Sequence, residues 1–240
     1  MTVRGEVRSL GLLATALARA EAWLLEPPEP VSAVVVPDPP RPIVTVRGLA
    51  PRCGASTVAR GLAAVLAMAD PRGAAVVVGP LAGAGVKLGT PAAVRLAREV
   101  AALGCDGIRA VGRLCLVPPG EPVALLAAER PCPVVIEVAP SSSPDDGLAI
   151  SDHAVLVASA AAEPTVATAV EASLAGAGHS AEVVVNRVEE PSPTDLPVGA
   201  TVLPDARLPA QVALACRGAH GALVEPLERL AGHCRARAPV

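Results

Sequence analysis

One stretch of the sequence decides the predicted fold: Ile43-Val-Thr-Val-Arg-Gly-Leu-Ala-Pro-Arg-Cys-Gly-Ala-Ser-Thr-Val-Ala-Arg-Gly-Leu-Ala63. It begins with a short apolar strand, continues through a loop over residues 47–55, and enters a helix that we expect at 56–69. This order favours an anion, because backbone N–H groups and the positive end of the helix dipole meet at the helix N-terminus. The stretch therefore predicts a phosphate-binding loop.

Only part of the usual phosphate-loop pattern, G-x-x-x-x-G-K-[ST], is present in this stretch. Gly54, Ser56 and Thr57 fit the pattern, whereas Ala55 stands where the lysine is expected. The positive charge that this lysine places on the β- and γ-phosphates is therefore missing. A simpler interpretation also accounts for these residues, namely an ordinary strand-to-helix turn in which Ser56 or Thr57 caps the helix.

The rest of the chain alternates short Val-rich runs with helical patterns. Runs without polar alternation are typical of strands covered on both faces, and helices between such strands indicate βαβ crossovers. The predicted strands cover 43–46, one or two short strands within 108–117, and 74–78, 134–138, 154–159, 182–186 and 200–203; the predicted helices cover 56–69, 91–103, 122–129, 165–177, 209–215 and 219–236. We therefore expect a three-layer α/β/α domain with a mostly parallel sheet over residues 42–237.

The N-terminal part of the chain has a different character. Residues 1–26 are predicted to contain a helix, because apolar residues recur there at helical spacing. Residues 27–41 form a stiff, extended linker, since seven prolines fall between Pro27 and Pro42. The helix is either a detached partner-binding element or an element that packs on the main domain.

Composition excludes several classes of protein. The hydrophobic fraction of 52% excludes disorder as the main state, and the absence of Phe and Tyr leaves Val, Leu and Ala to fill the core. The net charge of −3 provides no general attraction to nucleic acid. No apolar run reaches the length of a membrane span, so we expect a cytoplasmic protein.

Cysteine and histidine residues do not form a recognisable site. The six cysteines form no CxxC pair and have no histidine at metal spacing, which predicts reduced and partly buried thiols. The four histidines, His153, His179, His220 and His233, do not converge on a Ser or Cys motif, so we interpret them as surface residues.

Six segments follow the order of motifs in the MinD/ParA family of phosphate-loop ATPases, which the chain resembles over residues 41–235. They are Gly-Ala-Ser-Thr-Val-Ala at 54–59 and the segments 116–119, 133–140, 151–157, 183–188 and 203–209. The first of them is similar to the loops of CpaE-like pilus-assembly proteins and of septum-site-determining-like proteins. The resemblance implies the phosphate-loop ATPase fold, protein partners in pilus or division machinery, peripheral membrane association through those partners, and a homodimer.

The resemblance also implies a nucleotide site that binds ATP or ADP with Mg²⁺. Segment 133–140 is similar to the Walker B strand, with Glu137 where an aspartate is usual, and Asn186 lies where an Asn contacts adenine. Ser56 is the hydroxyl that would bind Mg²⁺. The complete set of implied binding residues is Arg52, Gly54, Ala55, Ser56, Thr57, Glu137, Asn186 and Arg187.

Several residues that active members of the family need for hydrolysis are absent. Ala50 replaces a signature lysine, Pro51 and Arg52 replace the two glycines after it, and the sequence has no Asp between Asp70 and Asp106. Loss of one preorganised donor commonly costs about 10²–10³ in rate. We therefore assign no catalytic residue and expect little hydrolysis.

Two residues keep alternative interpretations. Arg52 either grips a phosphate with its guanidinium or is an ordinary exposed loop residue. Glu137 either holds a metal through water or caps a turn. The leading hypothesis is a non-hydrolysing MinD/ParA-like protein that acts as a localisation or assembly factor for a pilus or the division site. The alternatives are a weak, partner-stimulated ATPase that uses Arg52, and a protein-binding module without nucleotide.

Overall fold

A computed structural model describes residues 41–78, 89–120, 122–138, 147–159, 181–188, 199–204 and 223–238. The predicted N-terminal helix, most of the proline-rich linker and the predicted helices at 165–177 and 209–215 lie outside these residues. The described strands are β1 (Ile43–Gly48), β2 (Ala74–Val77), β3 (Arg109–Val111), β4 (Leu114–Val117), β5 (Val134–Val138), β6 (His153–Ser159), β7 (Ala181–Val188) and β8 (Thr201–Pro204).

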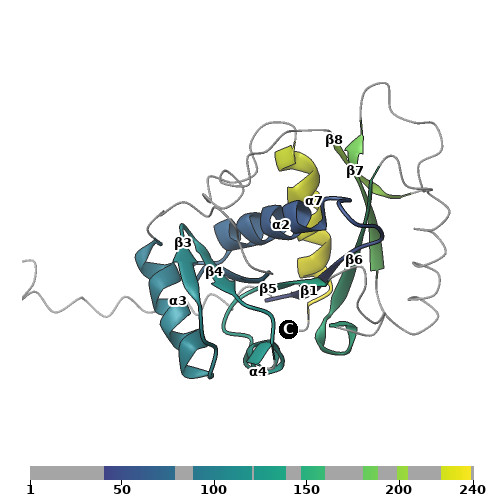
Figure 1. Cartoon of the computed structure of the whole chain (residues 1–240). Helices are drawn as coiled ribbons and strands as arrows, with labels where there is room; N and C mark the ends of the chain where they lie inside the picture. The colour runs from purple at the N-terminus through teal and green to yellow at the C-terminus, as the bar shows by residue number, and fades with distance from the viewer. Residues whose placement is uncertain are drawn as a thin grey trace, which may run out of the picture. The chain divides into compact units, whose positions relative to one another are not determined.

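These described strands form one eight-stranded sheet in the order β3-β4-β2-β5-β1-β6-β7-β8 (Figure 1). Strand β1 lies near the centre and pairs in parallel with β5 and β6. All other neighbours are also parallel except β3 and β4, which form an antiparallel hairpin. The prediction of a mostly parallel sheet is confirmed, and the region 108–117 contains two strands rather than one.

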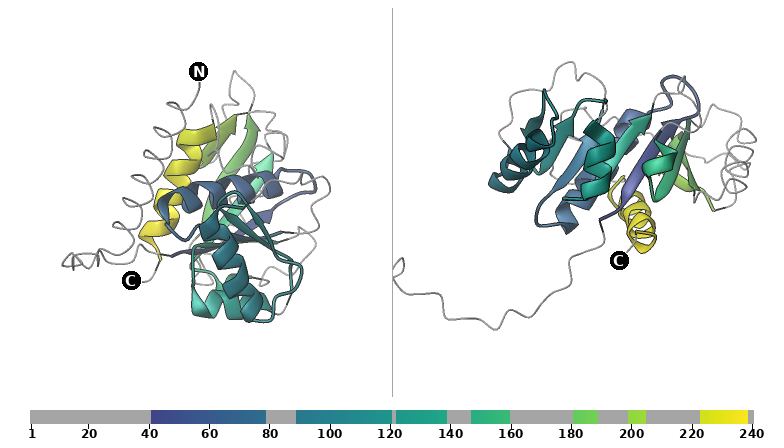
Figure 2. Two further views of the ribbon diagram at one scale, coloured as in Figure 1. Left: turned by 90° about the vertical axis from the view of Figure 1, so that its left-hand side faces the viewer. Right: turned by 90° about the horizontal axis from the view of Figure 1, so that it is seen from below.

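Helices cover both faces of the sheet, as Figures 1 and 2 show. The described helices are α2 (Ala55–Ala69), α3 (Pro91–Ala102), α4 (Pro122–Glu129), α7 (Val224–Ala236) and a short 3₁₀ helix, η1 (Leu148–Ile150). Helices α2 and α7 pack with Val44 and Val46, whereas α3 and α4 pack with Ile43. Successive residues of a strand point to opposite faces, so β1 contributes to both apolar layers. The three-layer prediction is confirmed.

Two helices approach each other closely on one face of the sheet. A Cβ atom at Gly61 of α2 would lie 2.8 Å from Cδ1 of Leu227 on α7. A larger residue at this position would require the Leu227 side chain to move, so Gly61 favours the close approach of α7 to α2. None of the helices that the structure describes combines the length and the apolar character needed to cross a membrane.

The thiol prediction is confirmed for the described cysteines, which are all buried and free: Cys53, Cys105, Cys115, Cys132 and Cys234. The interpretation of the histidines as surface residues is wrong for His153, which is 2% exposed. His153 begins β6, an inner strand, and its Nε2 lies 3.8 Å from a carboxylate oxygen of Glu182. Burial beside an acid on the neighbouring strand explains why a polar residue is tolerated there.

Candidate functional site

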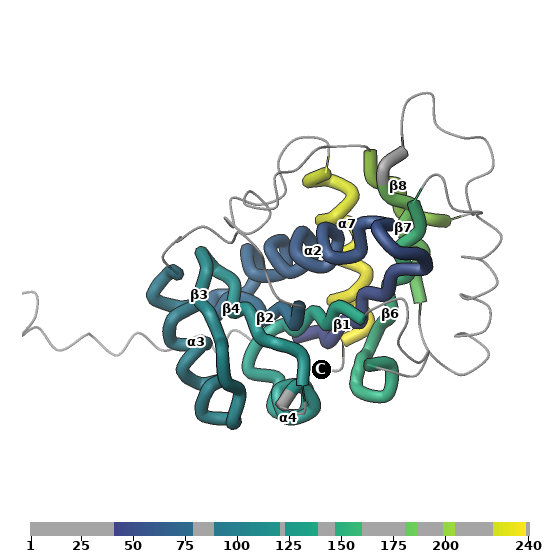
Figure 3. The backbone as a smooth tube through the Cα atoms, viewed as in Figure 1, coloured from purple at the N-terminus to yellow at the C-terminus, as the bar shows by residue number. Residues whose placement is uncertain are grey.

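The predicted phosphate loop lies at the carboxyl edge of the sheet, between β1 and α2. Figure 3 shows the chain passing from β1 through this loop into α2. The parallel partners β5, β6 and β7 end at the same edge as β1. Ligands of open α/β sheets bind at this edge, because the loops that leave the strands there form a crevice.

Backbone geometry prepares the loop to begin a helix. Arg52 has a φ angle of 63° and Gly54 one of 91°, so both residues adopt the left-handed conformation. The carbonyl of Gly54 accepts hydrogen bonds from the N–H groups of Thr57 at 2.9 Å and Val58 at 3.0 Å. Gly54 is the N-cap of α2 and no side chain caps this end, so the alternative in which Ser56 or Thr57 caps the helix is wrong.

The uncapped end of α2 presents donors to the crevice. The first N–H groups of a helix have no acceptor within the helix, and here they include those of Ala55 and Ser56. The helix dipole adds about half a positive charge at the same end. The loop therefore keeps the backbone donors of an anion site although the lysine is absent.

Ser56 and Glu137, which are 81 residues apart in the sequence, meet at this edge. The Ser56 hydroxyl donates a hydrogen bond to Oε1 of Glu137. Strand pairing explains the contact, because Glu137 of β5 lies opposite Val46 of β1, just before the loop. A loop Ser or Thr and an acid at the end of a neighbouring strand are the pair that holds Mg²⁺ in phosphate-loop NTPases.

Asn186 ties β7 to the loop. Its side chain is 7% exposed, and its Nδ2 donates a hydrogen bond of 3.0 Å to the carbonyl of Cys53. A Cβ atom at Gly54 would lie 2.1 Å from the same nitrogen. Asn186 thus fixes the loop through the Cys53 carbonyl. The adenine-binding role that the resemblance implies for Asn186 stays a prediction. The side chain of Arg187 lies outside the described part of the chain.

Arg60 is a site residue that the sequence interpretation missed. It lies one turn after Ser56 on α2 and is partly buried. Its Nε is buried without a hydrogen-bond partner. Burial lowers the pKa of the Arg60 guanidinium, and the nearby Glu137 carboxylate opposes this shift. The i, i+4 spacing from Ser56 could have revealed the residue, because it places both side chains on one helix face.

The structure brings most of the predicted residues together. Gly54, Ala55, Ser56 and Thr57 form the end of the loop and the first turn of α2, Glu137 contacts that turn, and Asn186 contacts the loop. Arg52 is exposed in the same loop. Together these residues could bind a phosphate group through backbone N–H donors.

The loop offers backbone donors for an anion beside a serine and acid of the kind that holds Mg²⁺. The uncapped N–H groups at the start of α2 favour a phosphate, and one turn along the same helix the buried Nε of Arg60 has no hydrogen-bond partner. Mg²⁺ prefers an octahedron of oxygen ligands. Glu137 accepts a hydrogen bond from Ser56, and its carboxylate interacts electrostatically with the Arg60 guanidinium. Among the described residues, no group of three or more His, Cys, Asp or Glu side chains could hold a metal ion.

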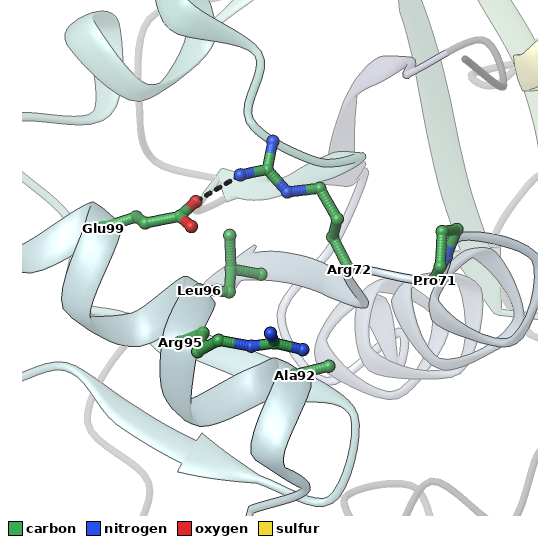
Figure 4. Close-up of a pocket in the computed structure, with 6 residues that line it drawn as sticks. All are labelled: Pro71, Arg72, Ala92, Arg95, Leu96 and Glu99. Carbon is green, nitrogen blue, oxygen red and sulfur yellow. Dashed lines mark hydrogen bonds and ion pairs between the residues drawn. The ribbon is translucent and has the colours of Figure 1, made fainter. Parts of the chain in front are cut away.

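A separate groove of about 320 Å³ lies away from the loop, between the α2–β2 turn and α3 (Figure 4). It is lined by Pro71, Arg72, Ala92, Arg95, Leu96 and Glu99. Arg72 and Glu99 form an ion pair of 2.5 Å across it, and their side chains are 40% and 48% exposed. These two charges are paired with each other and exposed to solvent. Neither is therefore a buried, unsatisfied group like the Nε of Arg60.

Comparisons with known proteins agree with the topology. No protein-family model matches the sequence, and no curated protein matches it. A ParA family ATPase from Chlorobium tepidum TLS matches with a TM-score of 0.53 and 14% identity, covering 81% of this chain and 98% of that one. The MinC:MinD cell division protein complex of Aquifex aeolicus matches with a TM-score of 0.57 and 12% identity, covering 80% and 96%. At such identities the likeness establishes the fold alone: the chain has the α/β fold of the ParA and MinD ATPases.

Proposed function

We propose that this chain is a non-hydrolysing member of the MinD/ParA family that acts through protein partners as a localisation or assembly factor. One observation carries the proposal. The loop keeps the shape and the backbone donors of a phosphate site, while Ala55 stands in place of the lysine. The shared fold supports the family, and the missing charge supports the loss of turnover.

Phosphoryl transfer depends on positioning and on stabilisation of charge that develops at the transferred group. A bound nucleotide would supply the phosphate groups. The N–H groups at the start of α2 would hold them, and Glu137 would fix the Ser56 hydroxyl. The residue directly after Gly54 is Ala55 rather than lysine, and the sequence between Asp70 and Asp106 has no Asp to orient water. The site would therefore hold a phosphate without cleaving it.

The biological role that we propose follows the resemblance of the loop to CpaE-like proteins. We place the chain in the cytoplasm, as a partner of pilus-assembly or division-site machinery and as a homodimer. The similar Aquifex aeolicus structure is a complex between two proteins, MinC and MinD, which supports an action through protein contacts. Residues 1–26 would serve as a partner-binding helix on the linker 27–41, joined to the domain at 42–237.

A steady-state ATPase assay tests the loss of turnover. The full chain should release no more phosphate than a Ser56→Ala variant, with Mg²⁺ present and at any protein concentration. Ser56→Ala is the matched control because it removes the hydroxyl but keeps the uncapped helix end. Turnover that the wild-type chain shows and Ser56→Ala abolishes would contradict the proposal.

One observation favours a second candidate, a weak ATPase stimulated by a partner. Arg52 lies inside the loop in the left-handed conformation, which costs about 1–3 kcal/mol for a residue other than glycine and is common at functional sites. If Arg52 replaces the lysine, Arg52→Ala should abolish both nucleotide binding and any stimulated turnover. If Arg52 is only an exposed loop residue, the variant should bind as the wild type does.

A further inference from the structure

We draw no further inference here: the strongest candidate, the groove between the α2–β2 turn and α3, is lined by the exposed Arg95 and by the ion pair of Arg72 and Glu99, and nothing in the structure shows what ligand or partner would cover it.

Discussion

The edge of the sheet at the amino ends of its parallel strands differs from the edge at their carboxyl ends in how polar and charged groups are paired. At the amino edge, charged side chains are paired by directed hydrogen bonds. Asp152 accepts two hydrogen bonds of 2.7 Å from Arg130 and a third of 2.8 Å from the N–H of Ile43. Glu182 accepts one of 2.6 Å from Thr201 and contacts the His233 ring at 3.0 Å.

At the carboxyl edge, the same sheet leaves polar groups unsatisfied. Arg60 has a buried nitrogen without a hydrogen-bond partner, and α2 has no side-chain cap. Each feature costs free energy that the rest of the fold must offset, and such costs concentrate at functional sites. The difference teaches that the amino edge stabilises the sheet while the carboxyl edge is arranged for a ligand.

The largest effect is expected from a substitution that removes a shared hydrogen-bond acceptor at the amino edge. Asp152→Ala should lower the free energy of unfolding by about 3 kcal/mol, because it leaves the Arg130 cation and the Ile43 N–H without their acceptor. Urea-induced unfolding followed by circular dichroism measures the change. Asp106→Ala removes an exposed aspartate and should stay within about 0.5 kcal/mol. A loss as small for Asp152→Ala as for the control would remove the contrast between the edges.

The next effect tests the close contact at the carboxyl edge. Gly54→Ala should cost about 2–3 kcal/mol, because alanine is strained at a φ of 91° and its Cβ would collide with Asn186. Gly104 has a φ of 88°, but a Cβ atom there would meet nothing within 4 Å, so Gly104→Ala should cost only about 1 kcal/mol. Equal losses of stability in Gly54→Ala and Gly104→Ala would mean that the contact with Asn186 adds nothing to the backbone strain at Gly54. In the Gly54→Ala, Asn186→Ala double variant the collision disappears, so its loss should be smaller than the sum.

A smaller effect is the pH dependence of the Glu182 cluster. Burial alone would raise the pKa of Glu182, but contacts with His153, Thr201 and His233 bring it down to about 2, from an ordinary value of 4.5. The carboxylate therefore stabilises the fold fully above pH 4.5, and this contribution is lost as pH falls toward 2. Glu182→Gln should lower the free energy of unfolding by about 1.5 kcal/mol at neutral pH. It should also make the free energy of unfolding less dependent on pH between pH 4.5 and pH 2.

The urea midpoint of the wild type and of Glu182→Gln, measured across this range, checks the prediction. Cys234 on α7 also lies near Glu182. Burial raises the pKa of its thiol to about 12, so the thiol stays protonated over this pH range. A wild-type midpoint that falls no faster with acid than that of the variant would contradict the role of the carboxylate.

The smallest effect concerns an ion pair that belongs to neither edge. Arg229 and Glu225 form an i, i+4 pair of 3.1 Å on α7, with side chains 58% and 87% exposed. Arg229→Ala should change stability by at most about 0.5 kcal/mol, because solvent screens exposed charges. Thermal melts at low and high salt measure it. A larger effect would show that pairing matters for stability even where it is exposed.

Much of the fold could be predicted because its signals are local. Short Val-rich runs indicated the buried strands, and the helix predicted at 91–103 is observed as α3, with Pro91 in its first turn after the Thr90 cap. The loop was located from Gly54 and Ser56. Its exact helix start, Ala55 rather than Ser56, depended on the conformation of Gly54, which a pattern of residue types does not express.

The site was harder to predict because its contacts join distant segments. His153 looked like a surface residue until strand order placed it beside Glu182. Arg60 belongs to no motif, and the burial of its Nε and its electrostatic interaction with Glu137 exist only in the folded chain. The contact of Asn186 with Cys53 spans 133 residues.

The sequence by itself determined the alternation of strands and helices, the position of the loop, and the absence of its lysine. Those features depend on residue type and on periodicity along a few turns of chain. Tertiary structure alone decided which distant side chains come together: Ser56 with Glu137, and Asn186 with Gly54. The physical reason is that strand order and helix packing minimise the free energy of the whole sheet, and no local pattern records which distant strands become neighbours.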